Sequence, residues 1–328
     1  MTKPPNDRGA ALITVLSMLA VLATLAIVVT EAASLSLRRA DNLVRMEQTR
    51  WYLLGAESFA GARLSMLNSA SARMDPSEWQ NLPLDFPLDD GVMRITLRDG
   101  DNCFNLNALV TTEEGGARTL SAIGLVQFSR LLDAVGVHQS QGGLAAALVD
   151  WLDTDAEAMP GGVEAENLPG RRPYRAANAL MADASELASV RGFDPPTIAQ
   201  LTRHTCVRPT TAPNLINPNT LTVEQAPLLL MAIDDLSLES ARRIIRDRPR
   251  GGWESVDDFL MHPALNALEL NQAGRAQFST RTRYVVLEAQ VERDRAREYG
   301  ASLLELGPDG RTAVVRRVFG LRGGEALL

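Results

Sequence analysis

The sequence contains few of the side chains and motifs that enzymes use for chemistry. It has three histidines, His138, His204 and His262, which are scattered along the chain without the spacing of metal ligands. The G-x-S-x-G, Walker and dinucleotide-binding glycine motifs are absent from the sequence. The carboxylates of the acidic segment at 150–157 stand at close, mostly alternate positions, which suits ion binding better than a separated acid and base. We therefore expect that the protein is not an enzyme.

Positive charge is also scarce. The 328 residues include 33 Lys and Arg against 40 Asp and Glu, so the net charge is -7. This balance gives no general electrostatic attraction to the phosphates of nucleic acid. The length allows about two folded units beyond an anchor.

Charge is missing altogether from one stretch near the N-terminus. After Lys3, Asp7 and Arg8, no charged residue occurs before Glu31. About 21 uncharged residues at about 1.5 Å each form a helix of about 31 Å, which is long enough to cross the hydrocarbon core of a bilayer. The sequence therefore predicts a transmembrane helix over residues 10–30.

Three interpretations of this segment remain open. A secretory signal peptide would be cut after the apolar run, where Glu31 makes a poor site. A plain anchor would keep Lys3 and Arg8 on the cytoplasmic side. A prepilin-type leader would be cut before the run, between Gly9 and Ala10, where glycine lets a peptidase approach the backbone closely.

The residues after the apolar run favour the third interpretation. Residues 31–74 contain no proline and only two glycines, Gly55 and Gly61, and apolar residues recur at about helical spacing. We expect one unbroken helix of about 60 residues, which is far longer than usual in globular proteins and suits a filament subunit. Asp75-Pro76 then ends the helix.

Cysteine is rare, and Cys103 and Cys206 are the only two. Both follow the apolar segment and are expected on the outer side of the membrane. In an oxidising compartment one disulfide is the default, and closing a loop of about a hundred residues contributes about 4 kcal/mol in the loop-entropy model. Two unpaired buried thiols are the alternative.

Alternating apolar and polar residues predict strands at 91–98, 283–291, 301–306 and 312–319, with a turn at 307–310. We expect these strands to share a small antiparallel sheet. Residues between them carry helix patterns at 121–134, 143–151, 185–190, 197–201, 224–233, 238–245 and 256–260. The chain thus leaves the sheet, forms a helical insertion and returns.

An acidic segment within the insertion suggests a cation site. It runs Asp150-Trp151-Leu152-Asp153-Thr154-Asp155-Ala156-Glu157 and continues through Glu164 and Glu166. Counting Asp153 as the first position of a calcium loop places Asp155 third, Glu157 fifth and Glu164 twelfth, but Ala158 replaces the usual glycine. Hard oxygen ligands in a flexible loop suit calcium, and a solvated acidic loop is the alternative.

A second segment of the insertion looks like helix-hairpin-helix DNA-binding modules. In those modules a glycine-containing hairpin offers N–H groups to phosphate. Here the hairpin position reads Ile233-Asp234-Asp235-Leu236-Ser237, whose carboxylates would repel phosphate. A packing scaffold is therefore the preferred interpretation.

Together these segments resemble a known family, the minor pseudopilin K subunit (GspK) of bacterial type II secretion systems, over nearly the whole chain. Its prepilin leader is similar to Arg8-Gly9 followed by residues 10–16. Its remaining motifs are similar to Phe104-Asn105-Leu106-Asn107, Asp150-Trp151-Leu152-Asp153-Thr154-Asp155, Pro173-Tyr174-Arg175-Ala176-Ala177-Asn178, Ser185-Glu186-Leu187, Val190-Arg191-Gly192-Phe193 and Asn217-Pro218-Asn219-Thr220.

The resemblance implies a function and a set of partners. It implies cleavage between Gly9 and Ala10 by prepilin peptidase, with N-methylation, and a single-pass inner-membrane protein with its head in the periplasm. Most pilin-like subunits have glutamate at the fifth mature residue, which here is Thr14, and K subunits lack that glutamate. Such a subunit suits the tip of the pseudopilus, where it assembles with the I and J minor pseudopilins and the major pseudopilin to initiate and cap the filament.

The resemblance also implies a calcium ion in the helical domain, with structural ligands drawn from Asp153, Asp155, Glu157, Glu164 and Glu166. The implied fold is α+β, a pseudopilin fold in which a long N-terminal transmembrane helix packs on a small antiparallel sheet, with a large all-helical inserted domain. The expected domains are a leader at 1–9, the transmembrane segment at 10–30, the pseudopilin helix and first strands at 31–104, the insertion at 105–278 and the C-terminal strands at 279–328. The alternative function is a membrane-anchored helix-hairpin-helix-like binding protein, for example in DNA uptake.

Overall fold

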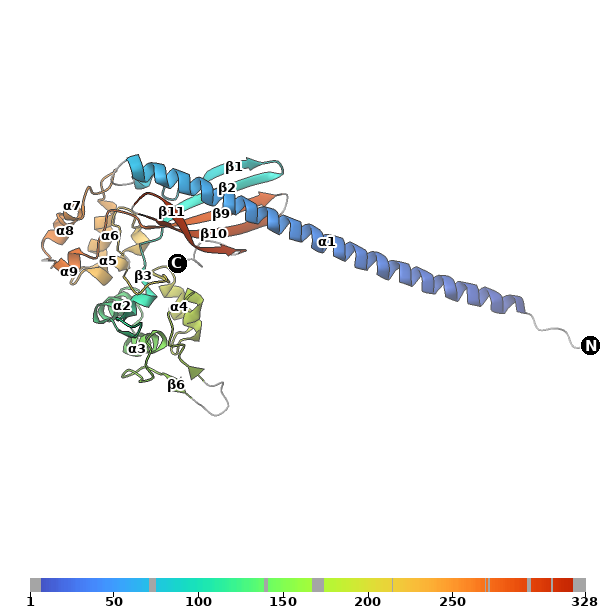
Figure 1. Cartoon of the computed structure of the whole chain (residues 1–328), viewed down its shortest axis with the longest axis horizontal. Helices are drawn as coiled ribbons and strands as arrows, with labels where there is room; N and C mark the ends of the chain where they lie inside the picture. Colours follow the sequence, from blue (N-terminus) through green and yellow to red (C-terminus); the bar gives the residue numbers. More distant parts are fainter. Residues whose placement is uncertain are drawn as a thin grey trace, which may run out of the picture. The chain divides into compact units, whose positions relative to one another are not determined.

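The computed structural model describes residues 7–320 except 71–74, 139–140, 167–173, 214, 269, 271, 294–295 and 308. The chain divides into two compact units, Met1–Tyr52 and Leu53–Leu328. Helix α1, Asp7–Ala70, is a single helix of 64 residues (Figure 1). The predicted long helix is therefore confirmed.

The first half of α1 has the properties of a membrane span. The most apolar 18-residue window has a mean hydropathy of 2.8 and none of it is buried. The hydroxyls of Thr14, Thr24 and Thr30 donate to the carbonyls of Ala11, Val21 and Ala26, each at 2.8 Å. Polar groups satisfied within the helix are tolerated in hydrocarbon. By length and composition, this helix can serve as a single membrane anchor.

The second unit contains a five-stranded antiparallel sheet in the order β1-β2-β9-β10-β11 (Figure 1). The central neighbours β2 and β9 are far apart in sequence and pair from Gly91 opposite Arg293 to Asp99 opposite Val285. The chain therefore leaves the sheet after β2 and returns at β9, as predicted. The strands are β1 Leu84–Leu88, β2 Gly91–Asp99, β9 Tyr284–Arg293, β10 Ala296–Leu306 and β11 Thr312–Phe319.

The last turns of α1 pack against this sheet (Figure 1). Leu53, Ala56, Ala60 and Leu64 recur at helical spacing and are at most 1% exposed. A side chain at Gly300 of β10 would lie 2.8 Å from a Leu53 methyl group, so glycine allows the close approach of helix and sheet. The buried small residues on α1 and the glycine in β10 thus fix the helix against the strands.

The insertion between β2 and β9 is mainly helical. Serine and aspartate side chains cap several of its helices, as Ser121 does by accepting from the Gly124 N–H at 3.1 Å. One hydrophobic core joins these elements, and within it Phe104 stacks on Phe128 with ring centroids 5.3 Å apart. The helices are η2 Leu106–Leu109, α2 Ala122–Ala134, α3 Gln141–Leu152, η3 Ala184–Ser189, α4 Pro195–Leu201, η4 Val223–Gln225, α5 Pro227–Ala232, α6 Leu238–Arg246, α7 Val256–Leu260, α8 Pro263–Asn266 and α9 Gln272–Arg275, and the 3-10 helix η1 Pro76–Glu78 precedes the sheet.

The described residues of the insertion also form three short strand pairs that were not predicted from the sequence. The parallel pair β3–β8 lies beside the two cysteines, and the other two pairs are antiparallel. Strands of two or three residues carry too little alternation to be recognised from sequence. They are β3 Phe104–Asn105 with β8 Thr205–Cys206, β4 Val110–Thr112 with β5 Arg118–Leu120, and β6 Ala165–Glu166 with β7 Tyr174–Arg175.

Cys103 and Cys206 form a disulfide, as predicted, with Cα atoms 5.7 Å apart and a sequence separation of 103 residues. Cys103 precedes β3 directly, and Cys206 ends β8. Both cysteines are buried, at 2% and 0% exposure. The bond therefore ties the start of the insertion to its middle within the core.

Buried asparagines attach the second half of the insertion to the end of the sheet. The Asn102 side chain donates to the carbonyl of Asn217 at 3.1 Å and to the Thr220 hydroxyl at 2.8 Å, and it accepts from the Asn217 N–H at 2.8 Å. Asn219 in turn exchanges two hydrogen bonds with the backbone of Trp253. The segment from Asn217 to Thr220 is therefore a structural junction, and its asparagines satisfy backbone groups that would otherwise be buried without partners.

Candidate metal site

Three carboxylates from the acidic segment converge on one point. Each of Asp150, Asp153 and Glu164 contributes an oxygen atom, and these atoms all lie within 4.8 Å of one another. Asp150 belongs to the last turn of α3 and Asp153 follows its end, so their spacing of three residues puts both on one helix face. Glu164 comes from the returning loop, directly before β6.

The cluster has buried oxygen atoms that lack hydrogen-bond partners. Asp150 is 0% exposed and Asp153 is 4% exposed. Within the described part of the chain, Asp150 Oδ2, Asp153 Oδ1 and Glu164 Oε1 are buried and accept no hydrogen bond. Like charges held together with unpartnered oxygen atoms are unfavourable unless a cation neutralises them. The donor set consists of hard oxygen atoms, so it fits calcium.

The pKa values of these three carboxyl groups are raised because the groups are buried close together. Burial, followed by repulsion from Asp155 and Glu164, raises the pKa of Asp153 to about 7. Burial also raises the pKa of Asp150 and of Glu164, in each case with repulsion from neighbouring carboxylates. Without a cation the cluster therefore retains protons that ordinary surface carboxylates lose.

The loop from 159 to 164 wraps closely around Asp150. The Met159 N–H donates to Asp150 Oδ1 at 2.9 Å. A side chain added at Gly162 would lie 2.0 Å from Asp150 Oδ2, so only glycine permits this approach. Backbone close to the carboxylates offers carbonyl groups in the neighbourhood, which calcium sites commonly use.

Two residues outside the acidic segment hold it in place. Arg118 of β5 donates from Nε to the Leu152 carbonyl and from Nη2 to the Asn178 carbonyl, both at 2.7 Å. Asn178, which has a left-handed φ of 47°, donates from its side chain to the carbonyl of Asp155. The role of Arg118 could not be predicted from the sequence, because no pattern links it to a segment over thirty residues away. Asn178 belongs to the motif Pro173-Tyr174-Arg175-Ala176-Ala177-Asn178, but the sequence indicated no structural role for it.

Only some of the predicted ligands lie in the cluster. Asp153 and Glu164 lie in the cluster, and Asp155 is exposed but close enough to raise the pKa of both. Glu157 is also exposed, and its N–H donates to Asp155 Oδ1 at 2.9 Å. Glu166 belongs to β6, and its side chain lies outside the described residues.

Asp150 was in the recognised segment but was not predicted as a ligand. Asp150 was left out because the calcium-loop numbering began at Asp153, three residues later. Its helical spacing from Asp153 was the signal that could have found it, because residues three apart share a helix face. Gly9 and Ala10, where the sequence predicts leader cleavage, both lie within α1 as the structure describes it.

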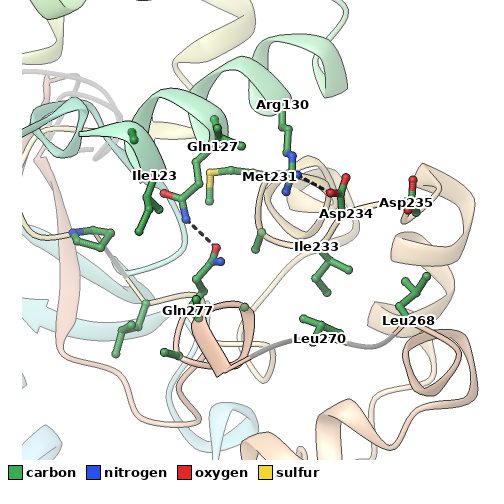
Figure 2. Close-up of a pocket in the computed structure, with 18 residues that line it drawn as sticks. Ile123, Gln127, Arg130, Met231, Ile233, Asp234, Asp235, Leu268, Leu270 and Gln277 are labelled. Carbon is green, nitrogen blue, oxygen red and sulfur yellow. Dashed lines mark hydrogen bonds and ion pairs between the residues drawn. The ribbon is translucent and has the colours of Figure 1, made fainter. Parts of the chain in front are cut away.

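The helix-hairpin-helix-like segment borders a separate, mostly apolar groove of about 790 Å³ (Figure 2). The Gln127 and Gln277 side chains are hydrogen-bonded at 2.6 Å, and Arg130 pairs with Asp234 at 2.7 Å. Dashed lines mark both interactions in Figure 2. Asp235 is exposed, with a φ of 56°. The hairpin between α5 and α6 therefore presents carboxylates where a phosphate-binding hairpin presents N–H groups.

Comparisons with known proteins agree with this architecture. Residues 102–210 and 216–281 match two family models that are both described as type II secretion system (T2SS), protein K. The chain is 31% identical to "Type II secretion system protein K" of Pectobacterium carotovorum subsp. carotovorum, covering 96% of this chain and 97% of the relative. It is 32% identical to the protein of the same name from Klebsiella pneumoniae, with the same coverage of both chains.

A solved structure shows the same fold. A chain in the crystal structure of the GspK-GspI-GspJ complex from the type 2 secretion system of enterotoxigenic Escherichia coli superposes with a TM-score of 0.73 and 28% identity. The match covers 87% of this chain and 100% of the solved chain. The fold of the matched part thus occurs in a known secretion component, and the chain belongs to the type II secretion system protein K family.

Proposed function

We propose that this protein is the minor pseudopilin at the tip of the type II secretion pseudopilus. In this role it assembles with the other minor pseudopilins, initiates and caps the filament, and so supports the export of folded proteins across the outer membrane. The observation that carries the proposal is the insertion between the neighbouring strands β2 and β9. A helical filament stacks identical small heads, and a head enlarged by a whole helical domain fits most easily at an end.

The N-terminal segment supports processing as a prepilin. In the proposed mature protein, prepilin peptidase removes the leader before Ala10, the new N-terminus is methylated, and the apolar helix remains as a single-pass anchor in the inner membrane. The fifth mature residue is then Thr14, whose hydroxyl donates to Ala11 within the helix. Thr14 offers no negative charge to the N-terminal amine of a neighbouring subunit. This fits a subunit at the tip, because no further subunit lies above it.

The helix also offers surface for assembly beyond the apolar span. Several large apolar residues of α1 are exposed there, and Trp51 is 69% exposed. Exposed apolar side chains in contiguous patches mark sites of association. We assign this surface to contacts with the helices of the I and J minor pseudopilins and the major pseudopilin, and the relative solved in the GspK-GspI-GspJ complex supports the first two partners. These residues are Leu35, Leu37, Leu43, Val44, Met46 and Trp51.

A calcium ion completes the proposed mature head. Asp150, Asp153 and Glu164 would hold it, with Asp155 beside them. The ion would supply positive charge where the three buried oxygen atoms lack donors. Its role is structural, because the chain near it belongs to loops that the carboxylates alone would push apart. A head in the periplasm also agrees with the disulfide, since that compartment is oxidising.

Labelling the head in assembled pseudopili tests the tip position. A peptide tag placed on the exposed loop at Glu114 would be detected by gold-conjugated antibody in electron micrographs of sheared filaments. We expect one label at one end of each filament. Labels distributed along the filament, or filaments assembled equally well without the protein, would contradict the tip and initiation roles.

A further inference from the structure

A second hollow, of about 540 Å³, lies between the segment that follows α1, residues 219–223, and the end of α6 with the loop after it. Three arginines line it, Arg246, Arg248 and Arg250, and no aspartate or glutamate is among the described residues of the lining. This composition differs from that of the chain as a whole, which carries a net charge of -7. A local excess of positive charge in a hollow concentrates anions.

Arg248 is held by two hydrogen bonds to backbone carbonyls. Its side chain is half-buried, and Nη1 donates to the carbonyl of Leu221 at 2.8 Å and to that of Pro218 at 3.3 Å. Across the described chain it forms no ion pair with a carboxylate, and burial lowers its pKa. The two carbonyls therefore orient the guanidinium without neutralising it, and a bound anion would compensate the desolvated charge.

The other two arginines remain available to a ligand. Arg250 is exposed, and it makes no hydrogen bond or ion pair with any other residue that the structure describes. Arg246 pairs with Glu239 at 3.0 Å, but both side chains are more than half exposed. Such exposed pairs contribute little and exchange readily.

Two carboxylates that neighbour the lining in sequence already have partners. Asp247, which lies between Arg246 and Arg248 in sequence, has its Oδ2 3.3 Å from Nε2 of His262. The carboxylate of Asp75 accepts from the N–H and hydroxyl of Ser77. Neither residue is part of the lining. The positive charge of the hollow is thus not cancelled from its walls.

The lining also offers neutral polar groups. Thr222 supplies a hydroxyl, and Gln80 donates to the Thr220 carbonyl while its Oε1 is buried without a hydrogen-bond partner among the described residues. A ligand that carries several anionic oxygens and one hydroxyl would match both kinds of group. Phosphate in its hydrogen phosphate form has this combination, whereas a single carboxylate has no donor.

We propose that this hollow is an anion site that takes a phosphate group, either free or on the headgroup of a lipid. Arg248 is the fixed donor, Arg250 is the free donor, and Arg246 turns from Glu239 to the ligand. The site is separate from the acidic cluster, and it does not depend on the proposed place of the protein in the filament.

Calorimetric titration of the full chain in an uncharged detergent tests the proposal. The probes are inorganic phosphate and glycerol 3-phosphate, added in calcium-free buffer at an ionic strength held constant with sodium chloride. Removing one charge-assisted contact weakens binding about tenfold or more. We therefore expect Arg250→Gln to weaken both probes about tenfold, and Arg248→Gln to weaken them at least as much.

Arg242→Gln is the matched control, because Arg242 is an exposed arginine of α6 outside the lining. It should leave affinity unchanged. Arg250→Gln decides the question even if Arg248→Gln unfolds, since Arg250 holds no part of the fold. Mixed micelles with phosphatidic acid, compared with micelles of phosphatidylcholine, then distinguish a lipid headgroup from free phosphate, and binding of either source supports the site.

Three results would overturn the proposal. The first is the absence of a heat of binding for either phosphate probe. The second is equal affinity in the Arg250→Gln and Arg242→Gln proteins, which would assign any binding to general charge. The third is that the wild-type chain binds a glutamate-rich peptide but neither phosphate probe, and that Arg250→Gln weakens the binding of the peptide.

Discussion

Glu57 on α1 and Arg317 on β11 form a bidentate ion pair across 260 residues of sequence, with N–O distances of 2.6 and 2.5 Å. The Glu57 side chain is only 7% exposed, and its Oε1 also accepts from the hydroxyl of Ser302. Helix and sheet are therefore joined by a directional polar contact as well as by apolar packing. The contact fixes how far α1 can slide along the strands.

Glu57→Gln is expected to lower the free energy of unfolding by about 2 kcal/mol, because Arg317 and Ser302 lose a shared charged acceptor inside the interface. Thermal unfolding of the full chain in detergent measures this. Asp85→Asn is the control, since Asp85 and Arg94 form an exposed ion pair, and it should have little effect. Equal loss of stability in both variants would contradict the argument.

Removing the disulfide tests the largest covalent constraint in the head. The double variant Cys103→Ser, Cys206→Ser should lose about 4 to 5 kcal/mol of stability, because the bond closes a loop of 103 residues. Denaturant unfolding measures the loss. A reducing agent should destabilise the wild-type protein and leave the double variant unchanged. Insensitivity of the wild-type protein would mean that the bond adds no stability.

The sequence predicted the large features because each had a repeating signal. The strand at β2 alternates along nine residues, and α1 contains no proline along its length. β1 was missed because Pro87 interrupts its pattern, although Pro87 is tolerated on an edge strand opposite Val92. The Asp89-Asp90-Gly91 turn that follows was an unused hairpin signal.

The site was harder to predict than the fold, because its parts meet only in three dimensions. Spacing along the chain identified Asp153 and Glu164, but it could not show that Asp150 turns toward them or that Gly162 lies against it. The role of Arg118 depends on the pairing of β4 with β5, which brings it to the end of α3. No local pattern carries that information.

Calcium should stabilise the head through the acidic cluster. We expect added calcium to raise the melting temperature of chelator-treated protein by several degrees, and Asp153→Asn to abolish the increase. Glu157→Gln is the control, because Glu157 is exposed and lies outside the cluster. It should retain the increase. A melting temperature that is insensitive to calcium and chelator would reject the site.

His204 should make the head sensitive to acid. Burial, aided by Arg203, lowers its pKa from 6.5 to about 4, so the unfolded chain binds a proton that the folded chain does not. Stability from this group is complete above about pH 6.5 and is lost as the pH falls toward 4. Between pH 7 and pH 5 the loss is about 2 kcal/mol.

Comparison with His204→Gln isolates this effect. Glutamine does not titrate, and the titration of the carboxylates changes the stability of both proteins in the same way. Denaturant unfolding at pH 7 and pH 5 should show a fall that is about 2 kcal/mol larger in the wild-type protein. Parallel pH profiles would mean that His204 is protonated without cost in the folded state.

The intact mass of the membrane-extracted protein tests processing. Coexpression with prepilin peptidase should give a chain that begins at Ala10 and carries an N-methyl group, and omission of the peptidase should leave the leader in place. Gly9→Leu should block the cut, because a bulky side chain keeps the peptidase from the backbone. Glu31→Gln should be cut normally, since Glu31 lies beyond the apolar run. A chain cut near Ala33, or one uncut with the peptidase present, would contradict the prepilin assignment and favour an exported or plainly anchored protein.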